Sequence, residues 1–489
     1  MSILYRITGG IARELRFLRF STEIFQKFFL SLLSKSVMHG TIFWWTTRRC
    51  YKMWFDESVF YQIYPLGFCG AERENDFGET RHRFNLIEAE IPRLKELGVG
   101  AVLFNPLFES ERHGYDTVDF FKIDRRLGTN EEFAALVRKL HEAGIRVVLD
   151  GVFNHVGRAF PPFREVLEKR EGTDYRFWFN INFWGNSRYN DGLDYENWEG
   201  HPELVKLRLD NQDVQRYLMD AVRFWIDTFD IDGLRLDVSY LLPPWFMEML
   251  RRTVNEKKPE FFLVGEVIHN NNFQQNVCPE RLDSITNYEG FRSMVSAFNS
   301  ANLFEIEHSM SRLFADTPWA LFKGKHLLNF VDNHDVERAC TALKNKANLF
   351  NLYTLLYTMP GIPCIYYGSE FGAEGDKSDF DYKLRPFIGD IDQSAHPELV
   401  AHLTKLAQIR KECPALSYGS YRKATCMNTN FSFVRECNGE KIIVAINIGD
   451  GDCTIRVEEA EGVNLLDGQV RNLNDIYLPP HTACIYKKN

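Results

Sequence analysis

Eight short apolar segments alternate with amphipathic segments along most of this chain, and this alternation restricts its fold more than any other feature. The apolar segments have the length and the branched and aromatic residues of buried strands, and most segments between them carry apolar residues at helical spacing. Strands that alternate with helices favour a parallel sheet, and eight such units are typical of a closed barrel. We therefore predict an α/β protein built on a (β/α)8 TIM barrel.

The predicted elements divide the chain into segments. The barrel is predicted to span residues 53–411, with strands at 59–68, 100–108, 146–153, 232–238, 261–267, 283–288, 326–332 and 362–370, and helices at 91–98, 130–144, 213–229 and 244–257. Between the third and fourth strands the chain is much longer than a βα unit needs, so residues 156–208 are predicted to form an inserted domain. Residues 412–489 are predicted to form an antiparallel β module, with strands at 431–437, 441–449, 453–460 and 482–489.

The first 52 residues differ in character from the rest. They carry nine Lys and Arg residues and few acids, and their most apolar piece, FFLSLL, is too short to span a membrane. No apolar stretch is followed by a convincing cleavage site. We expect a basic extension, flexible or outside the fold, which could be an arm, a poor targeting sequence or a result of start-site choice. We expect the protein to be cytoplasmic.

Charge and cysteine usage exclude several classes of partner. The formal net charge is -9, which argues against nucleic acid or an anionic membrane as the main partner. The ten cysteines form no CxxC pair and no Cys/His spacing typical of zinc, and they fit a reducing compartment, although disulfides in the C-terminal part remain an alternative. Neutral substrates fit this composition better.

The stretch GLRLDVSY places Arg235 and Asp237 two residues apart within an apolar strand. Alternate residues of a strand share a face, so the two charges lie together. Buried charges are costly unless they are paired, and a guanidinium favours the ionised form of a carboxylate. We therefore expect Arg235 to keep Asp237 as an anion, which is the form a nucleophile requires. The alternative is a structural ion pair.

Other polar residues end the predicted strands, where the active sites of such barrels lie. They are Asp150, Asn154 and His155 after the third strand, Glu266 after the fifth, and Asp332, Asn333, His334 and Asp335 after the seventh. Any one of them could be a helix cap, but three carboxylates from three strands at one mouth favour catalysis.

Glycoside hydrolysis with retention needs one ionised and one protonated carboxyl about 5 to 5.5 Å apart. Asp237 fits the nucleophile. Glu266 has the apolar neighbours Val264 and Val267, which would raise its pKa and let it act as acid and then base. Asp335 would hydrogen-bond sugar hydroxyls as charge develops.

Four ordered segments, DGVFNH, GLRLDV, GEV and FVDNHD, resemble the signature segments of the α-amylase superfamily of retaining glycoside hydrolases. The resemblance continues in YQIYPLGF, HGYDTVDFFKIDRRLGT and PGIPCIYYGSEFG, and it covers the chain from Met53 onward. It implies that the insertion is the family's domain B and that the C-terminal module is its β-sandwich domain.

The resemblance also implies residue roles. Asp237 would be the nucleophile, Glu266 the acid/base and Asp335 the transition-state stabiliser. The substrate-binding residues would be Tyr115, which stacks on the sugar, His155 and His334, which bind its hydroxyls, Arg235, which orients the nucleophile, and Asp381 and Arg385, which contact donor-side sugars.

Several positions depart from the family pattern. Arg208 stands where an Asn is usual, and Ser239 and Tyr240 replace a Lys-His pair that binds the acceptor side and assists a calcium ion in many α-amylases. Asn154 resembles one calcium ligand of the family, but a calcium site needs several oxygen ligands, and only this position matches. We therefore expect an enzyme that requires no cofactor. The VKL element and Val238 are similar to those of neopullulanases and cyclomaltodextrinases.

The sequence thus predicts hydrolysis of α-1,4 bonds in starch-derived α-glucans or maltodextrins by double displacement. Alternatives on the same scaffold are a neopullulanase- or cyclomaltodextrinase-like, an α-1,6-acting or a transglycosylating enzyme. A remote alternative is a non-catalytic amylase-like binding protein, related to the heavy chains that accompany transporters. Those chains lose catalytic acids, which this sequence keeps.

Overall fold

The structure is a computed structural model that describes residues 52–269, 273–458 and 460–488. By its internal contacts the chain divides into Met1–Lys52 and Met53–Asn489, and the account below concerns the second unit. Apart from Lys52, the predicted basic extension lies outside the described residues.

Eight parallel strands form the barrel that the sequence predicts, so this fold class is confirmed. They are β1 (Phe60–Ile63), β2 (Ala101–Phe104), β5 (Arg146–Gly151), β11 (Gly233–Leu236), β12 (Phe262–Gly265), β13 (Ser284–Ile285), β14 (Leu328–Asn329) and β15 (Ile362–Tyr366). Neighbouring strands follow the order β13-β12-β11-β5-β2-β1-β15-β14. A parallel bridge between Thr286 and Leu328 joins the two ends of this order, so the sheet closes.

All eight predicted barrel strands are longer than the observed ones, and a proline or a glycine explains where three of them end. The strand expected at 59–68 ends at Ile63, because Pro65 begins the short helix α5 (Pro65–Phe68). The strand expected at 100–108 stops before Pro106. The strand expected at 362–370 ends at Tyr366, two residues before Gly368, which has φ +84°.

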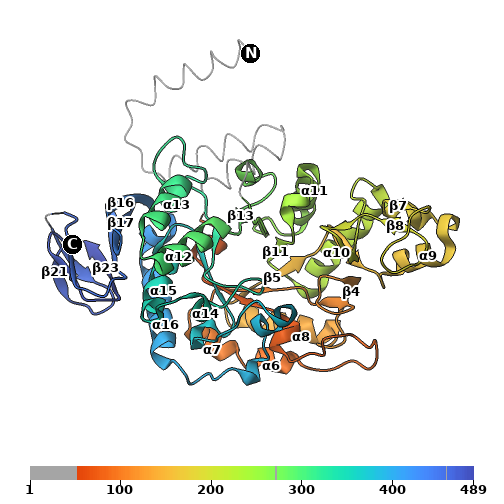
Figure 1. Ribbon diagram of the computed structural model, residues 1–489, viewed down its shortest axis with the longest axis horizontal. Coiled ribbons are helices and arrows are strands. Elements are labelled where there is room, and N and C mark those ends of the chain that lie inside the picture. The colour runs from red at the N-terminus through yellow and green to blue at the C-terminus, as the bar shows by residue number, and fades with distance from the viewer. Residues whose placement is uncertain (1–51, 270–272, 459, 489) are drawn as a thin grey trace, which may run out of the picture. The chain divides into compact units, whose positions relative to one another are not determined.

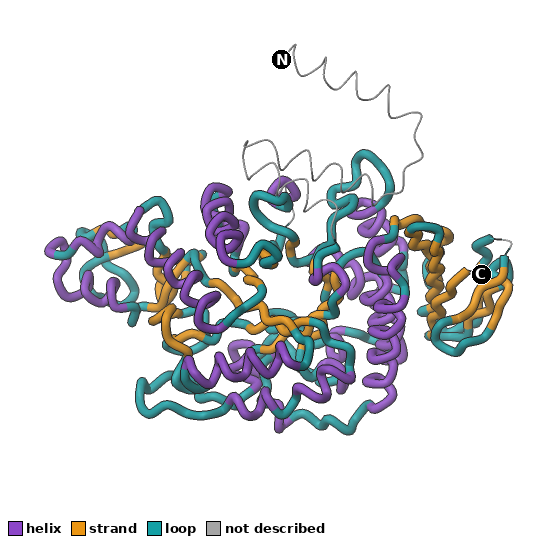
Figure 2. The backbone as a smooth tube through the Cα atoms, turned by 180° about the vertical axis from the view of Figure 1, so that it is seen from behind, coloured by secondary structure: helices purple, strands orange, loops and turns teal. Residues whose placement is uncertain are grey.

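Helices surround the barrel strands, as the purple segments of Figure 2 show. The longer helices are α7 (Ile91–Glu96), α8 (Asn130–Glu142), α10 (Gln212–Phe229), α11 (Pro244–Lys257), α12 (Tyr288–Ser300), α13 (Phe304–Phe314), α15 (Leu349–Thr358) and α16 (Pro397–Glu412), with the shorter α4 (Trp54–Glu57), α6 (Phe84–Glu88), α14 (Ala339–Ala342) and α17 (Pro414–Tyr418). The four predicted helices are confirmed. A capping box between Thr129 and Glu132 starts α8. Within the described ranges, no helix combines the length and the apolar character that crossing a bilayer requires.

The interior of the barrel is apolar at its base and polar at its mouth. Phe60, Leu103, Val148, Phe262 and Leu328 belong to one buried cluster inside the ring of strands. At Gly233 a Cβ would lie 2.8 Å from the carbonyl oxygen of Phe262, so only glycine lets β11 lie this close to Phe262 of β12. Because side chains alternate along a strand, the inward positions above this layer carry Gln62, Asp150 and Arg235.

The chain between β5 and α10 contains the predicted insertion. A three-stranded sheet has the order β6-β10-β9, with β6 (His155–Gly157), β10 (His201–Lys206) and β9 (Asn197–Trp198), and a ribbon joins β7 (Ile181–Asn182) to β8 (Asp194–Tyr195). The helix α9 (Pro161–Lys169) lies beside β7 and β8 in Figure 1.

The C-terminal strands form an antiparallel sheet of their own, in blue in Figure 1. Its order is β16-β17-β18-β23-β20-β21, and a separate ribbon pairs β19 with β22. The bounds are β16 (Ser420–Cys426), β17 (Asn430–Cys437), β18 (Glu440–Asn447), β19 (Cys453–Ile455), β20 (Glu461–Asn464), β21 (Val470–Asn472), β22 (Ile476–Leu478) and β23 (Thr482–Lys488). Sheet and ribbon bury a shared core that includes Val434, Ile455 and Leu478. Four of these strands, β16, β20, β21 and β22, are absent from the prediction.

Candidate active site

The polar mouth of the barrel is built on the C-terminal ends of β5, β11 and β12. Arg235 of β11 lies in register with Asp150 of β5 and with Val264 of β12. Glu266 follows Val264 by two residues, so it points the same way one step higher. Asp237 follows the last residue of β11. The mouth thus collects four ionisable side chains, and each of them is at most 5% exposed: Asp150, Arg235, Asp237 and Glu266.

Arg235 is shared among three carboxyl groups. Its Nη1 lies 2.5 Å from Asp150 Oδ2 and 3.5 Å from Asp237 Oδ1, and its Nη2 lies 2.7 Å from Glu266 Oε1. The closest partners of the guanidinium are therefore Asp150 and Glu266. The pair of Arg235 and Asp237 that the sequence predicts is present, but it is the longest of the three contacts, and Arg235 lowers the pKa of Asp237 less than burial and Glu266 raise it.

The buried carboxyl groups of Asp237, Glu266 and Asp150 keep their protons to a higher pH than exposed carboxyl groups do. Burial raises the pKa of Asp237 well above its usual value, and the neighbouring Glu266 raises it further. Burial also raises the pKa of Glu266 and of Asp150, although Arg235 opposes the effect in both. Because Glu266 raises the pKa of Asp237, the proton affinity of Asp237 depends on the charge of Glu266, and the two carboxyl groups titrate as a pair. A pair that holds one proton supplies both an anion and an acid.

The backbone after β11 directs a donor at Glu266. Val238 has φ +39° and ψ +43°, a conformation that is strained for a β-branched residue. In this conformation its N–H donates to Glu266 Oε2 at 3.0 Å. The Ser239 hydroxyl donates to the Glu266 carbonyl oxygen at 2.7 Å. The segment after Asp237 thus holds both the side chain and the backbone of Glu266.

Asp335, His334 and Tyr115 form a second group at the mouth. His334 Nε2 lies 3.0 Å from Asp335 Oδ2 and 2.5 Å from the Tyr115 hydroxyl, which also donates to Asp150 Oδ2 at 3.1 Å. Burial lowers the pKa of His334 to about 3, so its ring is neutral at pH 7. Because Gln62 Nε2 donates to His334 Nδ1 at 3.0 Å, the ring proton is on Nε2, facing Asp335 and Tyr115.

Arg385, a predicted substrate-binding residue, lies beside Asp335. Its Nη2 is 3.0 Å from Asp335 Oδ1, and its Nε donates to the His334 carbonyl oxygen. Burial opposes ionisation of Asp335, but His334 and Arg385 outweigh it and lower the pKa of this carboxyl. Asp381 Oδ2 is 3.8 Å from the same guanidinium. Asp335 therefore stays ionised at a pH at which the Asp237 and Glu266 pair still holds one proton.

His155 lies next to Asp237, whereas Asn154 does not face a cluster of carboxylates. His155 Nε2 is 3.9 Å from Asp237 Oδ2, and burial lowers the pKa of His155 to about 3. The Asn154 amide donates to His155 Nδ1 at 3.1 Å. Among the described residues there is no group of three or more His, Cys, Asp or Glu side chains arranged to hold a metal ion.

Two contributors to the site, Gln62 and Asn105, are absent from the sequence prediction, and a third, Asp150, has no role assigned there. Asp150 is recognised there only as a strand end, yet it binds both Arg235 and Tyr115. Gln62 and Asn105 fix His334 and Tyr115, with Asn105 Nδ2 donating to the Tyr115 hydroxyl at 3.1 Å. Gln62 could have been predicted, because it is a polar residue at an inward position of β1, whose other residues are mostly apolar.

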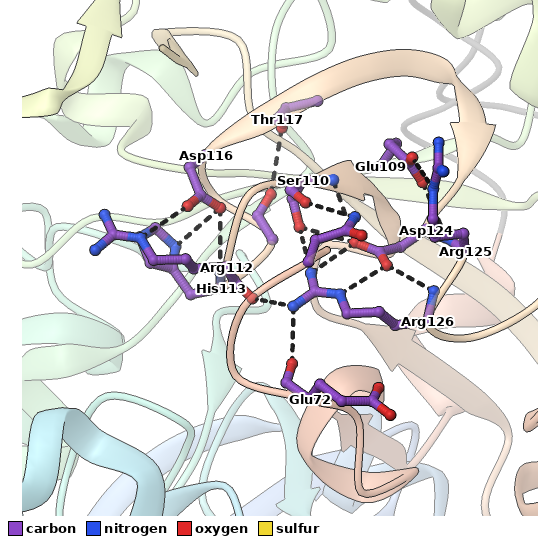
Figure 3. A network of polar contacts seen from close by, with 12 residues as sticks. Glu72, Glu109, Ser110, Arg112, His113, Asp116, Thr117, Asp124, Arg125 and Arg126 are labelled. Atoms are coloured by element: carbon purple, nitrogen blue, oxygen red, sulfur yellow. Dashed lines mark hydrogen bonds and ion pairs between the residues drawn. The ribbon is translucent and has the colours of Figure 1, made fainter. Parts of the chain in front are cut away.

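The loop that carries Tyr115 is held by a buried ion pair, shown in Figure 3. This loop joins β3 (Phe108–Ser110) to β4 (Thr117–Ile123). Arg126 binds Asp124 Oδ2 at 2.7 Å and donates to the backbone carbonyl oxygens of Arg112 and Glu72. Arg126 and Asp124 are almost fully buried. They therefore anchor the loop that carries Tyr115 to the segment around Glu72.

Arg126→Ala is expected to destabilise the protein by about 3 to 5 kcal/mol, because it leaves the Asp124 carboxylate buried without its partner. Arg126→Lys keeps the charge and part of the contact, so we expect a smaller loss. Urea denaturation monitored by fluorescence checks both values, and an unchanged free energy of unfolding in Arg126→Ala would contradict the anchoring role. Arg223→Ala, which removes an exposed pair with Asp220, is the control.

Comparison with known proteins relates this geometry to one family. The family model for the alpha amylase catalytic domain matches residues 62–396. A maltogenic alpha-amylase of Bacillus acidopullulyticus is 32% identical over 386 residues, which are 74% of this chain and 64% of that protein. A cyclomaltodextrinase of Thermoanaerobacter pseudethanolicus is 31% identical over 462 residues, 89% of this chain and 78% of that protein. The chain thus covers less than two thirds of the maltogenic amylase.

Solved structures show the same likeness. A cyclomaltodextrinase superposes with a TM-score of 0.77 at 28% identity, covering 89% of this chain and 78% of the other. A cyclic alpha-maltosyl-(1→6)-maltose hydrolase from Arthrobacter globiformis, in complex with that sugar, has a TM-score of 0.76 at 25% identity and covers 89% and 99%.

Proposed function

Since this chain belongs to the alpha-amylase family of glycoside hydrolases, we propose that it is a retaining enzyme that cleaves α-1,4-glucosidic bonds of maltodextrins or other starch-derived α-glucans. The observation that carries the proposal is the arrangement of Asp237 and Glu266 on one buried guanidinium, with Asp335 across the mouth. Two carboxyl groups that contact the same guanidinium lie close enough to act on one glycosidic bond.

The chemistry follows from how protons are distributed in the site. The ionised carboxylate of Asp237 attacks the anomeric carbon while the protonated carboxyl of Glu266 gives its proton to the departing oxygen. Glu266 then removes a proton from water, which attacks the same carbon, displaces Asp237 and restores the starting state. Asp335 stays ionised, and it hydrogen-bonds sugar hydroxyls as positive charge develops on the ring. Neutral His155 and His334 offer further hydrogen bonds to hydroxyls.

Tyr115 and Arg385 define the donor side of the mouth. The Tyr115 ring lies parallel to that of His334, with centroids 5.7 Å apart, and its hydroxyl is fixed by Asp150. A fixed aromatic face suits stacking on a glucose ring. Arg385 and Asp381 add polar groups beside it, consistent with contacts to further donor-side sugars.

Product analysis tests this proposal directly. The protein is incubated with maltoheptaose, with cyclomaltoheptaose and with pullulan, and the products are separated by chromatography while proton NMR follows the anomeric signal. We expect α-configured maltodextrins to appear first and to mutarotate later. First products in the β configuration, or binding of glucans with no cleavage, would overturn the proposal.

The same substrates separate the alternatives within the family. Cleavage of the cyclic sugar would favour a cyclomaltodextrinase-like activity, and panose from pullulan a neopullulanase-like one. Cleavage restricted to α-1,6 bonds, or products longer than the substrate, would indicate debranching or transglycosylation. Relatives named cyclomaltodextrinase and neopullulanase align over most of this chain, so the first two outcomes are the alternatives with direct support.

We also propose that the reaction needs no metal ion. The support is that Ser239 and Tyr240 stand where many α-amylases carry a Lys-His pair that assists a calcium ion, and that the Ser239 hydroxyl donates to the Glu266 carbonyl oxygen instead. Dialysis against EDTA is therefore expected to leave kcat and the melting temperature within about 20% and 2 °C of the untreated enzyme. A loss of activity that added Ca²⁺ restores would contradict this prediction, and a calcium-dependent α-amylase treated in parallel shows that the chelation worked.

We also propose an intracellular location, which agrees with the free thiol state of the cysteines. The nine cysteines among the described residues are free thiols, which suit a reducing compartment. A relative that is 28% identical is named an intracellular maltogenic amylase of Bacillus subtilis. Fractionation of the producing cells tests this location, and activity in the culture medium would contradict it.

A further inference from the structure

In the turn between β9 and β10, Glu199 has a backbone conformation that glutamate rarely adopts. Glu199 and Gly200 connect Trp198 to its partner His201, and both turn residues have positive φ, +46° and +89°. Such two-residue turns favour Asn-Gly or Asp-Gly, because asparagine and aspartate tolerate this conformation better than glutamate does. A glutamate here conflicts with local preference, and such conflicts are expected where a side chain has a function.

The side chain of Glu199 reaches the barrel. The Tyr240 hydroxyl donates to Glu199 Oε1 at 3.0 Å, and we call this pair the Tyr240–Glu199 contact. Tyr240 belongs to the short helix Ser239–Leu241, three residues after Asp237. Burial raises the pKa of Tyr240, and Glu199 raises it further, so the hydroxyl remains a donor at neutral pH.

The tip of the hairpin formed by β9 and β10 lies next to the catalytic groups. The Trp198 ring stacks on His201, with centroids 5.0 Å apart, and lies 5.9 Å from the ring of His155. His155 in turn is 3.9 Å from Asp237. The Asn197 side chain accepts a hydrogen bond from the N–H of Gly200, which holds the turn. The hairpin therefore places the Tyr240–Glu199 contact beside the catalytic groups, at the rim of the mouth.

Strand order places this contact opposite the donor side. In the closed ring of eight strands, β11 and β15 are four positions apart, which is the largest separation possible. Tyr240 follows β11, whereas Arg385 and Asp381 follow β15. If the donor sugars lie toward Arg385, the sugars beyond the cleaved bond extend toward Tyr240 and Glu199.

We propose that the Tyr240–Glu199 contact bridges the acceptor side of the mouth and limits how many sugar units extend beyond the cleaved bond. A longer acceptor segment has to break this contact, whereas a short one does not. The enzyme therefore prefers short maltodextrins and chain ends to the interior of long glucan chains. This inference rests on the proposed function, because it needs a glucan in the mouth.

The test compares a short with a long linear substrate. For each variant, kcat/KM is measured on maltotriose and on amylose, and the ratio of amylose to maltotriose is the readout. Tyr240→Phe removes only the hydroxyl, and we expect the ratio to rise by a factor of about two to ten, the range set by one exposed hydrogen bond. Tyr175→Phe is the matched control, because that ring packs on Trp178 elsewhere in the insertion.

Glu199→Asn separates specificity from damage to the fold. Asparagine suits positive φ, so we expect the melting temperature to stay equal or to rise while the amylose to maltotriose ratio rises as in Tyr240→Phe. If wild type cleaves maltodextrins but both ratios stay within 1.5-fold of wild type, the acceptor-side role is overturned. If wild type cleaves neither substrate, the proposed function fails as well, and the two failures are thus distinguishable.

Discussion

Asp237→Ala is expected to lower kcat by about 10⁴- to 10⁶-fold, the range found when a covalent nucleophile is removed. The cause is chemical, since alanine supplies no oxygen to attack the anomeric carbon. Steady-state kinetics on maltoheptaose checks the loss. Asp227→Asn, which alters an exposed carboxylate on α10 that pairs with Lys257, is the control and should keep wild-type activity.

The folded state should survive this change. Asp237 lies among other acidic groups and its pKa is raised, so removing its carboxyl relieves repulsion with Glu266 and Asp150. We expect the melting temperature to remain within a few degrees of wild type. A large drop would mean that the lost activity reflects unfolding, and Asp237→Asn, which keeps the side-chain volume, would then be the variant to measure.

Sodium azide gives this experiment a stereochemical readout. In Asp237→Ala the small anion occupies the space of the missing carboxylate, attacks from the face opposite the leaving sugar and forms a β-glucosyl azide, while Glu266 protonates the departing oxygen. Proton NMR identifies the β product. An α-configured azide from this variant would contradict the assignment of Asp237 as nucleophile.

The second large effect is expected for Glu266→Gln, which should lower kcat on maltodextrins by about 10²- to 10⁴-fold, because glutamine cannot protonate the departing oxygen. A substrate whose leaving group needs no proton, such as a 2,4-dinitrophenyl α-glucoside, should lose less in its first step. Glu248→Gln, which changes a partly exposed glutamate beside Arg281, is the control. Equal losses on both substrates would contradict the acid role.

The pH profile of the wild type follows from the same pair. The first step needs one proton on the Asp237 and Glu266 pair, so the rate falls at low pH, where both are protonated, and at high pH, where neither is. Because burial raises the pKa of both groups, each limb is expected at a higher pH than for isolated carboxyls. Glu266→Gln should remove the alkaline limb of kcat/KM, and a profile that keeps this limb would contradict the assignment.

Much of the fold could be predicted because each barrel strand has its own local pattern. The strands β11 and β12 are short, mostly apolar runs that a charged residue follows, and α8 and α10 have clear helical periodicity and capping residues. Strands such as β20, β21 and β22 have three or four residues and no comparable run. Their pairing is decided by the sheet they join, and sequence alone does not predict it.

The sequence by itself determined which chemical groups stand at the barrel mouth, because their places at the ends of successive strands follow from strand periodicity and parallel order. Only the tertiary structure decided how they share charge. Arg235 is two residues from Asp237, yet its closest partners come from β5 and from the end of β12, 85 and 31 residues away. Likewise, Tyr240 finds its partner in a hairpin 41 residues earlier. The physical reason is that electrostatic and hydrogen-bond energies depend on distance in space, and barrel closure sets that distance between segments far apart in the chain.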